Sequence, residues 1–164
     1  MKRWLLILAA IVALTALSLA SPLAAADRAG KAPLTIEVEG QGRTMGSGTF
    51  TLSGASTTDS DTGTVTYQFS SGVVTKSRAG QSFQRNSGTN TLKGKHGRLV
   101  IRTSGRVFGS LGGLGGYEAW TGTWSIVRGT GKYAGLKGSG GYAAVINSLD
   151  LHFFLRYEGF VTGS

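Results

Sequence analysis

The sequence predicts an all-β fold, an eight-stranded antiparallel closed barrel preceded by a signal-peptide helix. Alternation of apolar and polar residues is the first observation, and it is clearest near the C-terminus, where one strand face carries Leu151, Phe153, Leu155, Tyr157 and Val161. The second is a set of 27 glycines that all follow residue 29 without a fixed short period, which is typical of turns, bulges and close approaches between strands. The third is that no stretch after residue 26 has helical periodicity longer than about a turn.

The first 26 residues have the parts of a secretory signal peptide. Lys2 and Arg3 give a basic start, Trp4 to Ala20 is apolar and uncharged, and small residues lead up to Ala26. A membrane anchor is the alternative that the apolar length alone would permit, but Pro22 and the small residues favour cleavage. We therefore expect cleavage after Ala26 and a secreted or periplasmic protein.

The rest of the chain is long enough for one domain with a packed core. We expect a flexible leader at 27–33 and a single barrel domain at 34–164. The chain contains no cysteine, which excludes disulfide bonds and thiolate metal sites. Stability must therefore come from packing and from a closed network of hydrogen bonds.

The first strands are predicted from short alternating runs. Leu34 to Glu39 is the first strand, Thr49 to Ser53 the second, and Thr64 to Phe69 the third, which is rich in residues that favour strands. After the third strand the pattern loosens, and 73–76 and 81–85 are expected to form short separate strands.

The later strands follow from longer runs. Thr89 to Lys95 is expected to pair with Arg98 to Val107, in which Leu99, Ile101, Thr103 and Val107 share one face. Trp124 to Val161 predicts a strand, a glycine turn, a second strand, a short turn and a last strand. Strands without a helical layer form a sandwich or a closed barrel. Closure removes exposed sheet edges, so we expect the barrel.

Two segments of the chain resemble the allene oxide cyclase and dirigent barrel superfamily. One is Ile126 to Gly138, which contains a Gly-Thr-Gly-Lys-Tyr turn, and the other is the aromatic strand from Leu151 to Gly159. The resemblance implies an eight-stranded antiparallel barrel with a hydrophobic cavity, often as a homo-oligomer. In the cyclases that cavity holds an unsaturated fatty-acid epoxide, and in dirigent proteins it holds a phenolic radical or a quinone methide.

The resemblance carries over the scaffold and not the activity. The cyclases place a catalytic glutamate near the first strand, where this chain has Glu37 and Glu39. Alternation puts both glutamates opposite the apolar residues of that strand and hence outside the barrel. A family cysteine near the pocket has no counterpart here. We therefore name no catalytic residue, and Glu37 and Glu39 are the candidates that remain.

The other residue patterns in the sequence predict no cofactor and no metal site. Gly129 to Ala134 fits a dinucleotide fingerprint, but the glycines that follow rule out the helix that this fingerprint needs. His96 and His152 are the only histidines, and we expect both to be exposed. Asp59 and Asp61 share a polar loop, where we expect solvated carboxylates, with a weak cation site as the alternative.

The chain is basic, with a formal net charge of +9. A basic surface is expected from Arg98, Arg102 and Arg106 on one strand face, together with Lys93, Lys95, Lys132 and Lys137. Export argues against nucleic acid as the partner of this surface. An anionic polymer or lipid head group of the cell envelope is the better match, and a solvated face without a partner is the alternative.

Eight aromatic residues fall on faces predicted to point inward, and we expect them to bind a ligand: Phe50, Tyr67, Phe69, Trp120, Trp124, Tyr142, Phe153 and Tyr157. The interior of an eight-stranded barrel is either filled by side chains or holds one small ligand, and the sequence leaves both open. We expect an exported binding protein whose apolar cavity takes a lipid-like or aromatic molecule without covalent chemistry. The alternatives are an isomerase or cyclase, which needs an acid or base inside the barrel, and a packed structural protein of the envelope.

Overall fold

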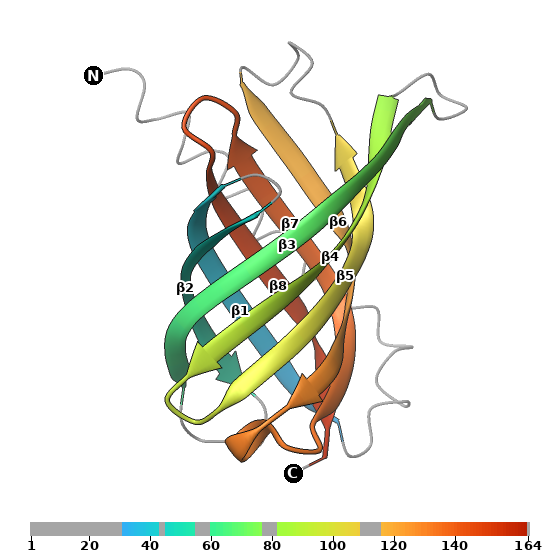
Figure 1. Ribbon diagram of the computed structural model, residues 1–164. Coiled ribbons are helices and arrows are strands. Elements are labelled where there is room, and N and C mark those ends of the chain that lie inside the picture. The colour runs from blue at the N-terminus through green and yellow to red at the C-terminus, as the bar shows by residue number, and fades with distance from the viewer. Residues whose placement is uncertain (1–30, 43–44, 55–59, 77–81, 109–115, 164) are drawn as a thin grey trace. The chain divides into compact units, whose positions relative to one another are not determined.

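Eight strands form a closed barrel in which each strand pairs antiparallel with its neighbours in sequence and β8 pairs with β1 (Figure 1). The computed structural model describes residues 31–42, 45–54, 60–76, 82–108 and 116–163. The predicted closed antiparallel barrel is therefore confirmed, while the predicted signal peptide lies outside the described residues. The strands are β1 (Ala32–Gly42), β2 (Met45–Gly54), β3 (Asp61–Lys76), β4 (Ser82–Gly94), β5 (Arg98–Phe108), β6 (Tyr117–Gly129), β7 (Lys137–Asn147) and β8 (His152–Thr162).

Several strands are longer than the alternation predicts. β3 continues through a register shift between Ser71 and Val74, so the short strand expected at 73–76 is the end of β3. The separate strands expected at 81–85 and 89–95 are one strand, β4. Hydrogen bonds to both neighbours hold these polar segments in the sheet, although their side chains give little apolar signal. Leu151, expected on the inward face of the last strand, is exposed in the turn before β8 with φ of 59°.

The inward faces of all eight strands make one hydrophobic core. Leu34, Ile36 and Val38 of β1 are buried, and Glu37 and Glu39 between them are exposed. The same alternation runs along β5, where the residues predicted to share a face are buried. Each strand therefore has one apolar face inside the barrel and one polar face outside it.

Several inward-facing glycines make room for aromatic rings. A Cβ atom on Gly88 would lie 2.2 Å from a ring carbon of Phe69, and one on Gly46 would lie 2.2 Å from the Tyr67 hydroxyl. Such separations are shorter than any ordinary carbon contact. The high glycine content thus serves ring packing inside the barrel as well as the turns.

The two ends of the barrel differ. The C-terminal ends of β1, β3, β5 and β7 lie at one end, which we call the cavity end, and those of β2, β4 and β6 lie at the closed end. At the closed end a short 3-10 helix, η3 (Gly131–Tyr133), follows β6 and buries Tyr133. Its Lys132 backbone N–H donates to the His96 carbonyl at 2.8 Å, which joins η3 to the turn between β4 and β5.

No helix in the described part of the chain has the length and apolar character needed to cross a membrane.

Candidate functional site

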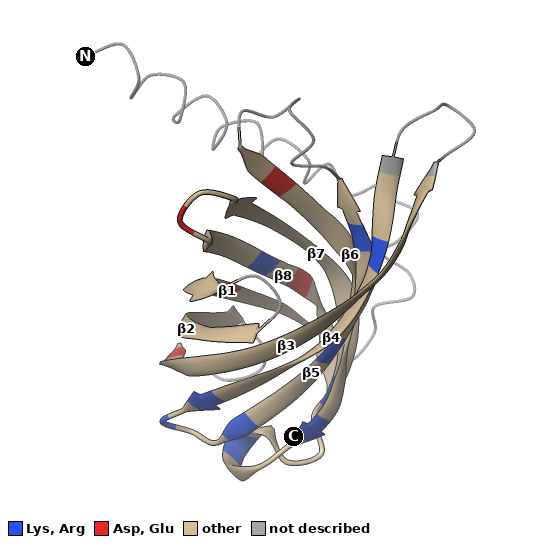
Figure 2. Cartoon of the chain, turned by 45° about the horizontal axis from the view of Figure 1, so that its top comes forward, with Lys and Arg blue, Asp and Glu red and all other residues tan. Residues whose placement is uncertain are grey.

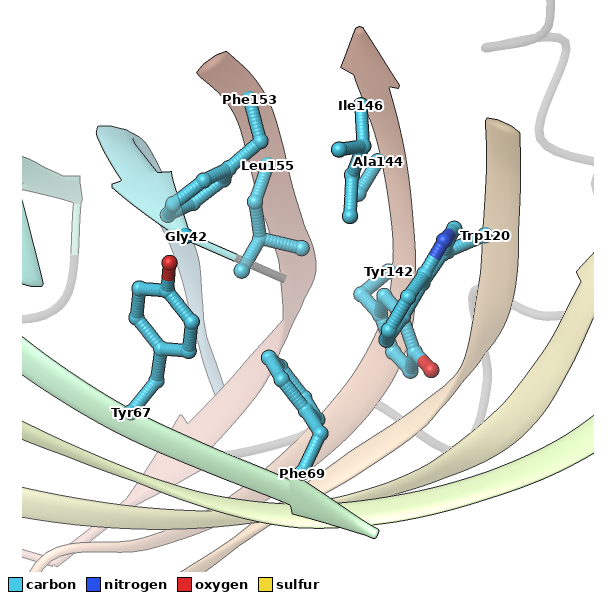
Figure 3. A pocket seen from close by; sticks show the side chains of 9 residues that line it. All are labelled: Gly42, Tyr67, Phe69, Trp120, Tyr142, Ala144, Ile146, Phe153 and Leu155. Atoms are coloured by element: carbon cyan, nitrogen blue, oxygen red, sulfur yellow. The ribbon is translucent and has the colours of Figure 1, made fainter. Parts of the chain in front are cut away.

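A small apolar cavity lies at the cavity end of the barrel (Figure 3). The volume that the centre of a water molecule can occupy in it is about 10 Å³, so the cavity has room for about one water. Its wall is formed by residues of β1, β3, β6, β7 and β8, so strands that are far apart in sequence contribute to it. The wall consists of Gly42, Tyr67, Phe69, Trp120, Tyr142, Ala144, Ile146, Phe153 and Leu155.

Four aromatic rings of the wall contact one another in a chain. Tyr67 meets Phe153 edge to face with ring centroids 4.8 Å apart, and Phe69 meets Trp120 in the same way at 5.2 Å. Tyr67 and Phe69 join the two pairs at 5.5 Å. Edge-to-face pairs of this kind add about 0.5–1.5 kcal/mol each beyond the area that they bury. The rings therefore form a continuous aromatic wall.

Tyr67 has a fixed orientation in this wall. Its hydroxyl donates a hydrogen bond to the Gln41 carbonyl at 2.9 Å, beside Gly42 at the end of β1. Burial raises the pKa of Tyr67 to about 12, so the hydroxyl stays a neutral donor at physiological pH.

Glu118 is a buried carboxylate beside the wall. Its side chain points inward on β6 with 2% exposure, and its Oε2 accepts a hydrogen bond from Trp120 Nε1 at 3.1 Å. It pairs across the sheet with Ile146, which lines the cavity. The prediction from the sequence named no carboxylate inside the barrel and so missed Glu118. Glu118 stands two residues before Trp120, and that spacing is the signal that places it inside.

The interior of the barrel also contains three buried polar side chains that we call the polar floor: Asn90, Thr103 and Tyr157. All three are at most 2% exposed. Asn90 pairs directly with Tyr67, and Tyr157 pairs directly with Tyr142, both of which line the cavity. Directly opposed side chains have Cβ atoms about 5 Å apart, so Asn90 and Tyr157 adjoin the wall. Thr103 lies opposite Gly88, the partner of Phe69.

The polar floor has hydrogen-bonding capacity that the described part of the protein does not use. Both amide atoms of Asn90, the Thr103 hydroxyl and the Tyr157 hydroxyl have no partner among the described residues. Burial, and to a smaller extent the neighbouring Tyr142, raise the pKa of Tyr157 well above its ordinary value. Each buried polar group without a partner costs about 1–3 kcal/mol. The floor can therefore donate and accept hydrogen bonds to a molecule in the barrel.

The structure brings together five of the eight aromatic residues predicted to bind a ligand. Tyr67, Phe69, Trp120, Tyr142 and Phe153 line the cavity. Phe50, Trp124 and Tyr157 are also buried inside the barrel, but they do not line the cavity.

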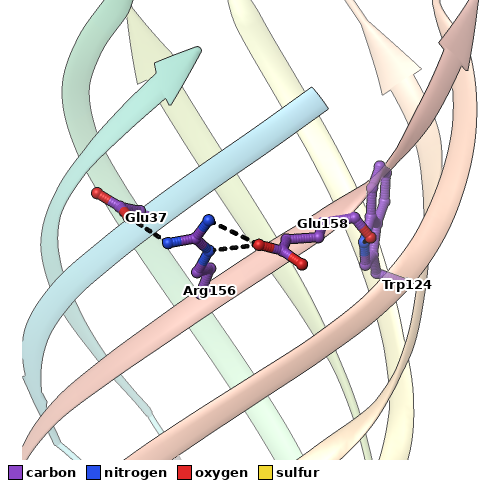
Figure 4. Close-up of polar contacts among 4 residues, drawn as sticks. All are labelled: Glu37, Trp124, Arg156 and Glu158. Carbon is purple, nitrogen blue, oxygen red and sulfur yellow. Dashed lines mark hydrogen bonds and ion pairs between the residues drawn. The ribbon is translucent and has the colours of Figure 1, made fainter. Parts of the chain in front are cut away.

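Trp124 is engaged elsewhere. Its Nε1 donates to the Glu158 carbonyl at 3.1 Å, toward the neighbouring strands (Figure 4). The aliphatic part of the wall was missed because the prediction used aromatic residues alone. Ala144 and Ile146 follow Tyr142 at the spacing of two that would have placed them on the same face.

Asp61 is part of the closed end and not of a solvated loop. It is the first residue of β3 and only 1% exposed, whereas Asp59 lies outside the described residues. Its Oδ1 accepts from the backbone N–H groups of Thr62 and Lys95 at 2.8 and 2.9 Å. Its Oδ2 accepts from the Tyr133 hydroxyl at 2.5 Å and from the His96 N–H at 3.2 Å. The expectation of a solvated carboxylate or a weak cation site is therefore wrong for Asp61.

These hydrogen bonds set the charge of Asp61. Burial acts to raise its pKa, but the bonds from Tyr133 and from the backbone of His96, Lys95 and Thr62 outweigh burial and hold the pKa below the ordinary value. Burial and the Asp61 carboxylate together raise the pKa of Tyr133. The pair is thus an ionised acceptor with a neutral donor.

Glu37 and Glu39 lie on the outside of the barrel. Their side chains are 60% and 54% exposed. Glu37 Oε1 lies 3.1 Å from Arg156 Nη1, and Arg156 also binds Glu158 (Figure 4). Glu39 Oε1 lies 3.1 Å from His152 Nε2. Neither glutamate can contact a molecule held in the cavity.

The two histidines and the glycine turn do not line the cavity. His96 and His152, which were expected to be exposed, are each partly buried. Within the described ranges, no group of three or more His, Cys, Asp or Glu side chains is placed to hold a metal ion. The segment that fits a dinucleotide fingerprint contains only the three-residue η3, which is too short to bind a pyrophosphate at its N-terminus.

No protein-family model, curated protein or solved structure matches this chain.

Proposed function

We propose that the protein binds a small lipid-like or aromatic molecule, without covalent chemistry, at the cavity end of the barrel. The observation that carries the proposal is an aromatic wall with buried polar neighbours whose atoms have no partner among the described residues. Ligand sites in proteins combine apolar walls with a few convergent polar groups in this way. The resemblance to the allene oxide cyclase and dirigent barrels agrees with such a role.

The polar floor favours a neutral ligand. No lysine or arginine among the described residues is buried, so a carboxylate reaching the floor would be buried without a cation. Burying an unpaired charge is far more costly than burying a neutral polar group. A hydroxyl, carbonyl or amide would instead satisfy Asn90, Thr103 and Tyr157.

Binding requires the wall to yield, because the cavity itself holds about one water. Phe69 is the ring of the wall that is only partly buried. Gly88, its direct partner on β4, has no side chain that would hold the ring in place. We expect the ring to turn outward and admit the apolar part of the ligand.

Probe binding to two matched variants tests the proposal. Ala144 lines the cavity, while its neighbour Ala143 pairs with Thr121 and Arg156 on the outer face of β7. Ala144→Leu fills the cavity, so we expect it to weaken binding of the neutral fluorescent probe N-phenyl-1-naphthylamine about tenfold or more, roughly 1.4 kcal/mol. Ala143→Leu makes the same change outside and should bind like the wild type.

The ligand chemistry is tested by competition. Decanol should displace the probe at a lower concentration than decanoate if the floor takes a neutral head. Melting curves establish that both variants are folded, and Ala144→Val replaces Ala144→Leu if the larger side chain prevents folding. Equal binding by the two variants, or no saturable binding to the wild type, would contradict the proposed site.

A second candidate function is favoured by Glu118. An isomerase or cyclase needs an acid or base inside the barrel, and Glu118 is a buried carboxylate bonded to a wall residue, Trp120. Its carboxylate already accepts a hydrogen bond from Trp120, whereas the polar floor has atoms without a partner among the described residues, so we rank this function below binding. Turnover of an epoxy fatty acid that disappears in Glu118→Gln would reverse the ranking.

A further inference from the structure

The outer faces of β4 and β5 carry a row of basic side chains that we call the basic stripe: Arg85, Lys93, Arg98, Arg102 and Arg106 (Figure 2). All five are exposed. Neither β4 nor β5 contains an aspartate or glutamate. The stripe therefore has no acid on its own two strands that could neutralise it.

Exposed acidic side chains lie on the opposite side of the barrel from the basic stripe. The ion pairs given by the described residues join Glu37, Glu39 and Glu158 to Arg156 and His152, all on β1 and β8. In the order around the barrel, β1 and β8 are separated from β4 and β5 by two strands on each side. The acidic side chains of these ion pairs therefore lie on strands away from the basic stripe.

Pairing within the stripe places like charges directly opposite each other. Lys93 is the cross-strand partner of Arg98, and Arg85 is the partner of Arg106. Like charges in direct opposition destabilise a sheet. The fold retains this repulsion at both ends of one strand pair, and an anionic partner bound along the stripe would relieve it.

The shape of the stripe indicates an elongated partner. Arg85 and Lys93 are eight residues apart on β4, a distance of about 27 Å along an extended strand. Arg102 stands between them on β5, opposite Thr89. The stripe is therefore long and only about two strands wide.

Its chemistry indicates a hydrophilic partner. Hydroxyl side chains, such as Ser87 and Thr91, alternate with the charges on the outer face of β4. Phe83 and Phe108 share the outer face with Arg106, whose guanidinium lies 4.8 Å over the Phe83 ring. Phe83 is buried and Phe108 is partly buried, and none of the exposed large hydrophobic side chains of the described residues lies on β4 or β5. Insertion into a lipid surface needs such side chains, and binding of single-stranded nucleic acid uses aromatic platforms for the bases.

We propose that the basic stripe binds a linear anionic polysaccharide. Arginine and lysine pair with the carboxylate or sulfate groups of such a chain, and the serine and threonine hydroxyls hydrogen-bond its sugar hydroxyls. This binding is independent of the cavity, because the stripe lies on the outer faces of β4 and β5, whereas the cavity wall and the polar floor face the inside of the barrel.

Two single substitutions with the same charge change test the proposal, with heparin as the probe. Arg102→Ser removes the centre of the stripe, and we expect it to weaken heparin binding about fivefold and to reduce its salt dependence. Arg156→Ser removes an arginine from the opposite face, where it pairs with Glu37 and Glu158. It should leave heparin affinity within about twofold of the wild type.

Equal weakening by both substitutions would mean that net charge alone attracts the polymer, and it would overturn the proposal. Parallel measurements use phosphatidylglycerol vesicles and single-stranded DNA at the same salt concentration. Tighter binding to either of them than to heparin would also overturn it. Retained binding of N-phenyl-1-naphthylamine by Arg102→Ser shows that the variant is folded and that its cavity is intact.

Discussion

Asp61 ties two turns together at the closed end of the barrel. Its carboxylate accepts hydrogen bonds from the turn between β4 and β5, at Lys95 and His96, and from Tyr133 after β6. Hydrogen bonds to an ionised acceptor are about twice as strong as those between neutral groups. Because Asp61 is the first residue of β3, its side chain links the start of that strand to both of these turns.

We expect Asp61→Asn to lower the free energy of unfolding by about 2 kcal/mol at neutral pH. The asparagine keeps the size of the side chain, but it loses the charge and turns an N–H group toward other donors. Urea unfolding of the wild type and the variant measures the difference.

The effect should depend on pH. The pKa of Asp61 is lower in the folded protein than its ordinary value of 3.8. Its stabilising contribution is therefore complete above the unfolded pKa and is lost as the pH falls through the folded pKa. The difference in the free energy of unfolding between wild type and Asp61→Asn should be complete at pH 7 and should become smaller below about pH 4. A gap of the same size at both pH values would contradict this account.

At the residue scale, the sequence indicates the position of Thr103 but not of Asn90. Thr103 lies in register with Leu99, Ile101 and Val107, and the alternation places it inward correctly. Asn90 lies in a run of polar residues in which only Leu92 is a large apolar residue. With one apolar residue there is no pattern that tells the inward face from the outward face.

At the element scale, glycine and aromatic residues on neighbouring strands act as pairs. Phe69 lies over Gly88, and Tyr142 lies over Gly122, where a Cβ would come within 2.8 Å of its ring. The glycines let large rings lie flat against the next strand inside a narrow barrel. The local sequence of one strand cannot show this, because the ring that needs the space belongs to another strand.

Gly88→Ala should lower the free energy of unfolding by about 2 kcal/mol, as overpacking does in a filled core. The added methyl group would meet the Phe69 ring at 2.2 Å and the Gln68 carbonyl at 2.7 Å. Gly141→Ala is the matched control, since it is exposed on β7 and its nearest neighbour would be 3.8 Å away. A Gly88→Ala protein as stable as the control would show that Phe69 does not rest on Gly88.

The boundaries of a strand also depend on its pairing with neighbouring strands. β5 agrees with its alternation to within a residue, whereas β3 and β4 run further than their apolar residues indicate. The register shift at Ser71 and Val74 breaks the period of two inside β3. Only pairing with β4 shows that the two parts are one strand.

At the scale of the whole molecule, closure could be predicted and the contents of the barrel could not. Many short alternating strands without helices or cysteines leave few ways to protect sheet edges, and closing the sheet is one of them. Whether the interior is filled depends on how side chains from distant strands meet. Five of the predicted aromatics surround the cavity, and three fill the barrel elsewhere.

The molecule has two different ends and two differently charged faces. Asp61 and Tyr133 fasten the closed end, and the aromatic wall and polar floor face the cavity end. The basic stripe occupies β4 and β5, and the acidic side chains concentrate on β1 and β8. We expect the two binding sites to act independently, because they use opposite surfaces of the barrel wall.

Native mass spectrometry of the protein purified from its own host tests the central claim most directly. We expect a species heavier than the polypeptide by one small, neutral, apolar molecule, and we expect Ala144→Leu prepared in the same way to lack it. A wild-type protein that always has the mass of the polypeptide alone, under conditions that preserve weak complexes, would contradict the claim and indicate a barrel that is simply packed.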